Sequence, residues 1–213
     1  MQSYTSLPRL GAAVAVLVIG ALALWQMGAF SAAGDAETTA GDGSVVELHP
    51  ADASIDTLVA AGQSVGLRAG DVAPDFEFSA FDGKRMRLSD FRGRPVFLNF
   101  WATWCGPCRA ELPAMEVLLR EHAADQLAII GVNNGERIQT AERFLQKLDV
   151  ELTEYAYDPA ASIVRRYSIL GLPTSYFIDA DGIITGVFAT QLSPALMEEA
   201  AAEAIAGYTT PVN

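Results

Sequence analysis

Two cysteines that enclose a Gly-Pro pair are the residues of this chain whose type and spacing best suit a chemical reaction. Cys105 and Cys108 are the only cysteines among the 213 residues. In thiol–disulfide exchange a thiolate attacks a disulfide sulfur, and a second thiolate nearby can resolve the mixed disulfide that results. We therefore predict a redox-active disulfide between Cys105 and Cys108, with Cys105 attacking, Cys108 resolving and no separate cofactor.

A structural role for these cysteines is the weaker interpretation. The stabilisation that a disulfide provides grows with the length of the loop that it closes, and this loop is very short. A zinc site needs about four ligands at recognisable spacing. The only histidines, His49 and His122, are not paired with further cysteines, so we expect no metal site.

A buried strand followed by a helix is the setting that these cysteines need. Val96–Phe100 is a nearly continuous apolar run, typical of a strand covered on both faces. A helical pattern then runs from Cys105 to about His122. Unpaired N–H groups and the helix dipole at such an N-terminus stabilise a thiolate, whose thiol otherwise has a pKa of about 8.5. Cys108 falls one turn later on the same face of this helix, within reach of Cys105.

The rest of the chain alternates strands and helices. Phe76–Phe78 and Met86–Leu88 are predicted to form a hairpin around the turn Asp82-Gly83. Further elements are predicted, in chain order, at strand Leu127–Val132, helix Glu136–Leu148, strand Leu152–Tyr157, helix Pro159–Tyr167, strand Thr174–Ile178, strand Ile183–Phe188 and a helix from Ser193 to about Ala206. This order predicts a mixed α/β sheet with helices on both faces.

An uncharged apolar run near the N-terminus predicts a membrane anchor. Residues 10–30 are long enough at helical rise to cross a hydrocarbon core of about 30 Å. Arg9 precedes the run and acidic residues follow it, which predicts a single-pass protein with residues 1–9 in the cytoplasm. A cleaved signal peptide is the alternative, because Ser31-Ala32-Ala33 offers the small residues that cleavage requires. In both cases the following residues are exported to a compartment where disulfides persist.

Composition and charge indicate how the residues after the apolar run are organised and which partners they exclude. Residues 31–69 are rich in Ala, Gly, Asp, Thr and Ser, which predicts a flexible linker ahead of one domain at residues 70–210. The formal net charge is −12. Such a chain has little with which to neutralise a phosphate backbone, so we expect no nucleic-acid partner.

The residues around the cysteines resemble a known family. Trp104-Cys105-Gly106-Pro107-Cys108 is similar to the active-site motif of thioredoxin. The wider frame, Gly70–Phe76, Asn99–Cys105 and Arg109–Pro113, resembles the TlpA/ResA branch of thioredoxin-like proteins. These proteins are membrane-anchored and extracytoplasmic, and the cytochrome c biogenesis reductase CcmG is a relative. The resemblance implies a periplasmic thioredoxin fold, tethered to the bacterial inner membrane, with an added N-terminal β-hairpin and an inserted helix–strand unit for which Glu136–Tyr157 is the candidate.

The same resemblance points to a substrate-binding loop. Gly171-Leu172-Pro173-Thr174 is similar to the family's cis-proline loop, so Leu172, Pro173 and Thr174 are expected beside the cysteines. The backbone at Leu172 would then pair with an extended substrate segment, in the manner of strand addition. The plainer interpretation of Pro173 is a proline at the first position of a strand, where the missing N–H costs little.

Other residues near the motif are expected to shape the site. Trp104 is expected at the surface beside the cysteines, where an aromatic side chain can contact substrate, whereas Trp101 is expected in the core. Gly106 and Pro107 resemble the loop of the reducing rather than the oxidising variant of the motif. The neighbouring residues also influence the redox potential.

Asn99 and Glu111 are the two positions from which proton transfer can be argued. In thioredoxin the strand position that matches Asn99 is usually a buried acid, and the plainer interpretation of an amide there is an internally hydrogen-bonded core residue. Glu111 is the substitute candidate, because it lies one helical turn after Cys108. The matching glutamate of ResA-like proteins is associated with the active site and tunes the thiols. An exposed helical glutamate is the alternative.

The combined pattern predicts an extracytoplasmic protein-disulfide reductase. The resemblance implies an exported disulfide substrate, either apocytochrome c or a copper-site assembly protein, and a membrane electron donor of the DsbD/CcdA type. We expect a monomer that is attached to the membrane by its N-terminal helix. A disulfide oxidase or isomerase of the same fold is the alternative. A copper chaperone and a peroxiredoxin rank lower, because no histidine lies near the motif and Thr103 is one position too close to Cys105 for a peroxiredoxin.

Overall fold

The computed structural model describes residues 62–80 and 82–207. The anchor expected at residues 10–30, the segment before it and most of the linker expected at residues 31–69 lie outside this range, as do residues 208–210 of the expected domain. Within the described ranges no helix is long and apolar enough to span a membrane.

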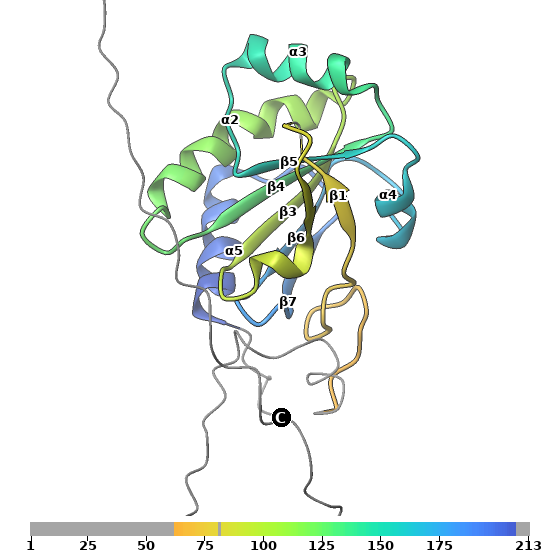
Figure 1. Ribbon diagram of the computed structural model, residues 1–213. Coiled ribbons are helices and arrows are strands. Elements are labelled where there is room, and N and C mark those ends of the chain that lie inside the picture. The colour runs from red at the N-terminus through yellow and green to blue at the C-terminus, as the bar shows by residue number, and fades with distance from the viewer. Residues whose placement is uncertain (1–61, 81, 208–213) are drawn as a thin grey trace, which may run out of the picture. The chain divides into compact units, whose positions relative to one another are not determined.

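A mixed sheet of seven strands organises the described residues, in the order β2-β1-β5-β4-β3-β6-β7 (Figure 1). The strands are β1 (Glu77–Ser79), β2 (Arg85–Arg87), β3 (Val96–Trp101), β4 (Ala128–Asn134), β5 (Glu154–Asp158), β6 (Thr174–Ile178) and β7 (Ile184–Phe188). β3, β4 and β5 are parallel, whereas β6 pairs antiparallel with β3 and β7 antiparallel with β6. β3 therefore has a hydrogen-bonded neighbour on each side.

Helices cover both faces of this sheet (Figure 1). They are η2 (Leu88–Phe91), α2 (Gly106–Glu121), α3 (Ile138–Leu148), α4 (Ser162–Arg166) and α5 (Pro194–Ala206). The helices α2, α3 and α5 pack on one face, and η2 and α4 pack on the other. All residues of β3 are buried because its side chains alternate between the two cores, with Leu98 and Phe100 in one and Phe97 and Trp101 in the other. Cover on both faces explains why this strand is apolar at nearly every position.

The predicted elements are present, with a correction to the helix expected at Pro159–Tyr167. The helix α4 is shorter, because the carboxylate of Asp158 accepts the backbone N–H groups of Ser162, Ile163 and Val164. These are N–H groups of a first helical turn, which have no partner within the helix. The capping aspartate thus sets the start of the helix three residues later than the position of Pro159 predicts.

The predicted N-terminal hairpin and inserted unit are both present, and they pair with each other. β1 and β2 form the antiparallel hairpin. The inserted unit consists of α3 and β5, and β5 lies parallel to β4. On its other side β5 meets β1 through the antiparallel pair of Ser79 and Tyr157. The insertion therefore connects the hairpin to the central strands.

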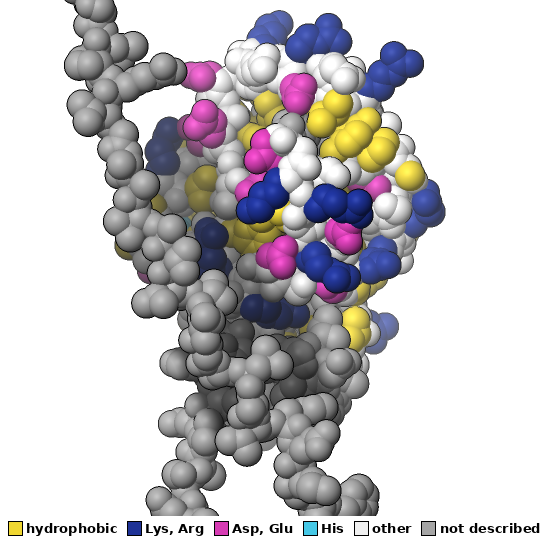
Figure 2. Space-filling view, in the orientation of Figure 1, with side chains coloured by type: hydrophobic (Ala, Val, Ile, Leu, Met, Phe, Trp, Pro, Cys, Tyr) yellow, Lys and Arg dark blue, Asp and Glu magenta, His cyan; other side chains and the backbone are white. Residues whose placement is uncertain are grey.

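Charged side chains of both signs are interspersed on the face drawn in Figure 2. Arg87 Nε lies 3.3 Å from a carboxylate oxygen of Asp75, and Arg85 pairs with Glu77. Exposed pairs of this kind contribute about 0–1 kcal/mol each to stability. Because carboxylates interrupt the cations, this face offers no continuous basic stripe for a phosphate backbone.

His122 links the end of α2 to α5. Its Nδ1 lies 2.8 Å from an oxygen of Asp125 and its Nε2 lies 2.9 Å from an oxygen of Glu198, while the side chain is 15% exposed. The hydrogen bond with Asp125 raises the pKa of His122, and Glu198 acts in the same direction against the effect of burial. The protonated imidazole therefore helps to hold the helix that follows the cysteines.

We predict that His122→Gln lowers the free energy of unfolding by about 0.5–1 kcal/mol near pH 6 and by much less near pH 9. Because the folded-state pKa lies above the ordinary value of 6.5, the contribution of the charge is fully present below that value and is lost as the pH rises through the folded-state pKa. Urea unfolding at the two pH values measures the difference. An effect of equal size at both would assign His122 to packing alone.

Candidate active site

Cys105 lies at the junction where β3 ends and α2 begins. It is the N-cap residue of α2, and its Sγ accepts a hydrogen bond from the backbone N–H of Cys108 at 3.2 Å. The two cysteines are joined by a disulfide. Both are almost fully buried, whereas Gly106 and Pro107 between them are exposed. The sulfur of Cys105 thus occupies a position where the N–H groups of a helix stabilise negative charge.

The predicted cis-proline loop lies beside this junction. The Leu172–Pro173 peptide bond is cis, as predicted. Thr174 opens β6, and its hydroxyl donates to the carbonyl of Gly171 at 2.8 Å. Because Thr174 is paired with Phe100 across β3 and β6, the loop before β6 lies next to the chain that leaves β3. Leu172 also packs against the core that contains both cysteines.

The two tryptophans near the motif have the different environments that were predicted. Trp101 is fully buried, with its ring 6.1 Å from that of Phe144 and 6.4 Å from that of Tyr155. Trp104, immediately before Cys105, is 68% exposed. A large apolar side chain is thus presented to solvent next to the Cys105–Cys108 disulfide.

Asn99 and Glu111 are both buried in the same core as the cysteines. Asn99 Nδ2 donates a hydrogen bond to Ser175 Oγ at 3.0 Å, which agrees with the interpretation of a hydrogen-bonded core amide. Glu111 is 1% exposed, so the alternative of a solvent-exposed glutamate is wrong. Its Oε1 accepts the backbone N–H of Leu192, and its Oε2 makes no hydrogen bond with any residue that the structure describes.

The buried carboxyl group of Glu111 titrates far from its ordinary range. Burial raises its pKa to about 7, although the Leu192 N–H and the Asn99 side chain favour the ionised form. Desolvation penalises the charge more than these two donors compensate. Glu111 and Cys108 are both among the buried residues of α2. A group that can gain or lose a proton near neutral pH therefore lies one helical turn from the second cysteine.

Sequence reasoning did not identify two polar residues that take part in this region. Ser175 accepts the hydrogen bond from Asn99, and Glu136 binds Thr103, which lies shortly before Cys105. Both contacts depend on the pairing of strands that are far apart in the chain. The polar residues that follow the apolar strand β4 are the only signal in the sequence that could have drawn attention to Glu136.

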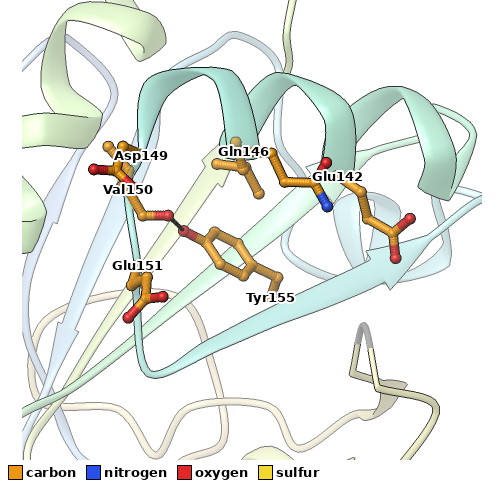
Figure 3. Close-up of a pocket in the computed structure, with 7 residues that line it drawn as sticks. Glu142, Gln146, Asp149, Val150, Glu151 and Tyr155 are labelled. Atoms are coloured by element: carbon orange, nitrogen blue, oxygen red, sulfur yellow. Dashed lines mark hydrogen bonds between the residues drawn. The ribbon is translucent and has the colours of Figure 1, made fainter.

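A cavity elsewhere in the fold is separate from these residues. It is an open pocket of about 400 Å³ between α3 and β5, and Glu142, Asp149, Glu151 and Tyr155 are among its lining residues (Figure 3). The hydroxyl of Tyr155 donates to the carbonyl of Val150 at 2.9 Å. In the part of the chain that the structure describes, no group of three or more His, Cys, Asp or Glu side chains is placed to hold a metal ion.

Comparison with known proteins identifies the family of this domain. Residues 69–187 match the model of the AhpC/TSA family. The chain belongs to this family. The thioredoxin-like protein YneN of Bacillus subtilis is 36% identical over 138 residues, which are 64% of this chain and 81% of that protein. The thiol-disulfide oxidoreductase ResA of Bacillus thuringiensis is 36% identical over 116 residues, which are 54% of this chain and 66% of ResA.

A solved structure supports the same assignment. The chain is 32% identical to the thiol:disulfide interchange protein DsbE of Chlorobium tepidum, with a TM-score of 0.62 over 66% of this chain and 99% of that one. The predicted resemblance to ResA and its thioredoxin-like relatives is confirmed, as is the fold of the described residues. The protein is a thioredoxin-like disulfide oxidoreductase.

We predict that Glu111→Gln stabilises the oxidised protein by about 1–3 kcal/mol near pH 8 and changes its stability little near pH 4.5. The raised pKa of Glu111 means that the folded state binds its proton more tightly than the unfolded chain, whose ordinary value is 4.5. The contribution of Glu111 to stability therefore falls as the pH rises from about 4.5 to about 7, and the neutral amide removes this loss. Denaturant unfolding at several pH values tests the slope. A difference between the wild-type and Glu111→Gln curves that stays constant across this interval would contradict the raised pKa.

Proposed function

We propose that this protein is an extracytoplasmic reductase of protein disulfides. The observation that carries the proposal is the position of Cys105, whose Sγ accepts the Cys108 N–H at the N-terminus of α2 beside the cis-proline loop. A thiolate at this position is stabilised by the N–H groups at the start of the helix. The exposed Trp104 and the Leu172–Pro173 loop flank it.

The reaction begins with the reduced dithiol. The Cys105 thiolate attacks one sulfur of a substrate disulfide, which breaks the substrate S–S bond and releases one substrate thiolate that takes up a proton. The product of this step is a mixed disulfide between Cys105 and the substrate. Cys108, deprotonated, then attacks the Cys105 sulfur and releases the second substrate thiol. Two electrons have passed to the substrate, and the Cys105–Cys108 disulfide remains.

Substrate recognition is assigned to the surface around the cysteines. Leu172 and Pro173 precede β6, whose first residue, Thr174, is already bonded to the turn. An extended substrate segment can therefore pair with the backbone at Leu172 in the manner of an added strand. Trp104, next to Cys105 in the chain, supplies an exposed apolar contact. Gly106 and Pro107 leave the loop between the cysteines accessible.

Proton transfer is assigned to Glu111 in place of the buried acid that thioredoxin carries at the position of Asn99. With a pKa of about 7, the carboxyl group of Glu111 can accept the proton that the Cys108 thiol must lose before it attacks. Its Oε2, which makes no hydrogen bond with another described residue, is the acceptor that we assign to that proton. The Asn99 side chain favours the ionised form of Glu111 and so offsets part of the rise in pKa that burial causes.

The reducing direction, location and partners complete the proposal. The Cys-Gly-Pro-Cys motif and the relation to ResA favour a reductase over the alternative of an oxidase or isomerase. The uncharged run at residues 10–30 favours a single-pass anchor in the bacterial inner membrane, with a monomeric periplasmic domain. We assign as substrate apocytochrome c or a copper-site assembly protein. A membrane protein of the DsbD/CcdA type would then return two electrons to the Cys105–Cys108 disulfide.

We predict that Cys108→Ala accumulates a mixed disulfide between Cys105 and the physiological substrate, because the attacking thiolate remains and the resolving thiolate is absent. Non-reducing electrophoresis followed by mass spectrometry of the adducts identifies the partner. Cys105→Ser is the matched control and should trap nothing. Trapping by Cys105→Ser alone would reverse the assigned order of the two cysteines, and equal trapping would mean that either cysteine can attack.

We also predict a low reduction potential, closer to about −270 mV, the value of thioredoxin, than to about −120 mV, the value of the oxidant DsbA. Equilibration of the dithiol with glutathione or dithiothreitol buffers, read by alkylation of free thiols, measures it. A value near the DsbA end would favour the oxidase or isomerase alternative.

A further inference from the structure

The carboxylate of Glu136 joins the turn that follows β3 to the end of β4. Its two oxygens accept three hydrogen bonds, from the backbone N–H of Thr103 at 2.8 Å, from the hydroxyl of Thr103 at 2.5 Å and from Asn133 Nδ2 at 2.8 Å. Its own backbone N–H donates to Asn133 Oδ1 at 3.2 Å. Hydrogen bonds to an ionised acceptor are stronger than those between neutral groups.

The sheet brings these residues together. β3 and β4 are parallel, and Trp101 is paired with Asn133, so the two strands end at the same edge. After Asn133 the chain turns sharply at Gly135, which adopts φ of 71°, and its N–H donates to the Asn133 carbonyl at 3.1 Å. A positive φ is readily available to glycine. This turn directs Glu136 back towards the chain that leaves β3.

The chain that leaves β3 forms a short turn before α2. Ala102 to Cys105 is a turn closed by a hydrogen bond from the Cys105 N–H to the Ala102 carbonyl at 3.2 Å. Thr103 and Trp104 are its central residues, and the Trp104 side chain is largely exposed rather than packed. The bonds from Thr103 to Glu136 therefore tie the middle of this turn to the sheet. The turn ends at Cys105, which is the N-cap residue of α2.

We propose that Glu136 is a positioning residue of the redox site, which orients the Cys105 sulfur against the first N–H groups of α2 by holding Thr103. This inference rests on the proposed function and deepens it, because it names a residue outside the motif on which the attacking thiolate depends. Glu136 lies in the connection to the inserted helix α3, so the insertion contributes to the site that it adjoins.

Two variants of Glu136 separate position from charge. In Glu136→Gln the amide oxygen can accept from the Thr103 N–H and Asn133, while the amide NH₂ donates to the Thr103 hydroxyl, which serves as donor or acceptor. This variant keeps the contacts and removes the charge. Glu136→Ala removes both. A nearby carboxylate disfavours a thiolate, so loss of charge alone lowers the Cys105 pKa, whereas loss of orientation towards the helix raises it.

The test follows the reaction of the reduced protein with a small disulfide, dithiobis(nitrobenzoic acid), across the pH range. For Glu136→Ala we expect the midpoint of the profile to move up by about one pH unit and the limiting rate at high pH to fall about tenfold or more. For Glu136→Gln we expect an unchanged or lower midpoint and most of the rate. Glu142→Ala, which changes another carboxylate of the inserted unit (Figure 3), is the control and should match wild type. Glu111 titrates in all of these proteins alike.

Two results would refute the positioning role of Glu136. A midpoint that moves down equally in the alanine and glutamine variants would mean that Glu136 acts by charge alone, and unchanged profiles would mean that it serves only the stability of the turn. If Glu136→Ala does not fold, Thr103→Val decides, because it removes only the hydroxyl bond and should lower the limiting rate several-fold. The pH profile reports the reactivity of the Cys105 thiol towards a small disulfide. It therefore tests Glu136 separately from the proposed function, which would be refuted if the wild-type protein failed to reduce protein disulfides.

Discussion

The hydrogen bond between the Cys108 N–H and the Cys105 sulfur is the interaction around which the rest of the site is arranged. It exists because β3 ends one short turn before α2 begins, which leaves the first N–H groups of the helix directed at Cys105. The sheet fixes one end of that junction, since β3 has partners on both sides. The helix fixes the other end, through the buried residues of α2 that pack on the sheet. The short loop between them therefore has defined ends.

Asn99 and Glu111 are two polar side chains inside this core, and their environments differ. Asn99 is satisfied by Ser175 of the neighbouring strand. Glu111 keeps one oxygen on the Leu192 N–H and leaves the other without a hydrogen bond among the described residues. A buried carboxyl group of this kind lowers its cost by taking up a proton, which is the reason for its raised pKa. The protonated carboxyl group of Glu111 thus places a proton one helical turn from Cys108 without a buried charge.

The elements that depend on apolar spacing and capping residues could be predicted, whereas the contacts of particular polar side chains could not. Val96–Phe100, the helix after Cys105 and the final helix capped by Ser193 follow from apolar spacing and capping residues. The cis bond at Pro173 came from the resemblance, because nothing local distinguishes it from a proline at a strand start. The start of α4 depends on Asp158, whose role as a cap at such a distance has no simple signature. The contact of Glu136 with Thr103 arises only when β3 and β4 lie side by side.

The pairing of Ser79 with Tyr157 makes the hairpin and the insertion depend on each other for their places in the sheet. β5 is the strand through which the hairpin reaches the central sheet, and the hairpin in turn covers the outer edge of β5. Neither addition is complete alone: without β5 the hairpin loses its place in the sheet, and without the hairpin β5 becomes an open edge of the kind that invites aggregation. The two segments, separated by the whole redox motif in the chain, behave as a single accessory module. A minimal thioredoxin-like core could be obtained from this fold only by removing both together.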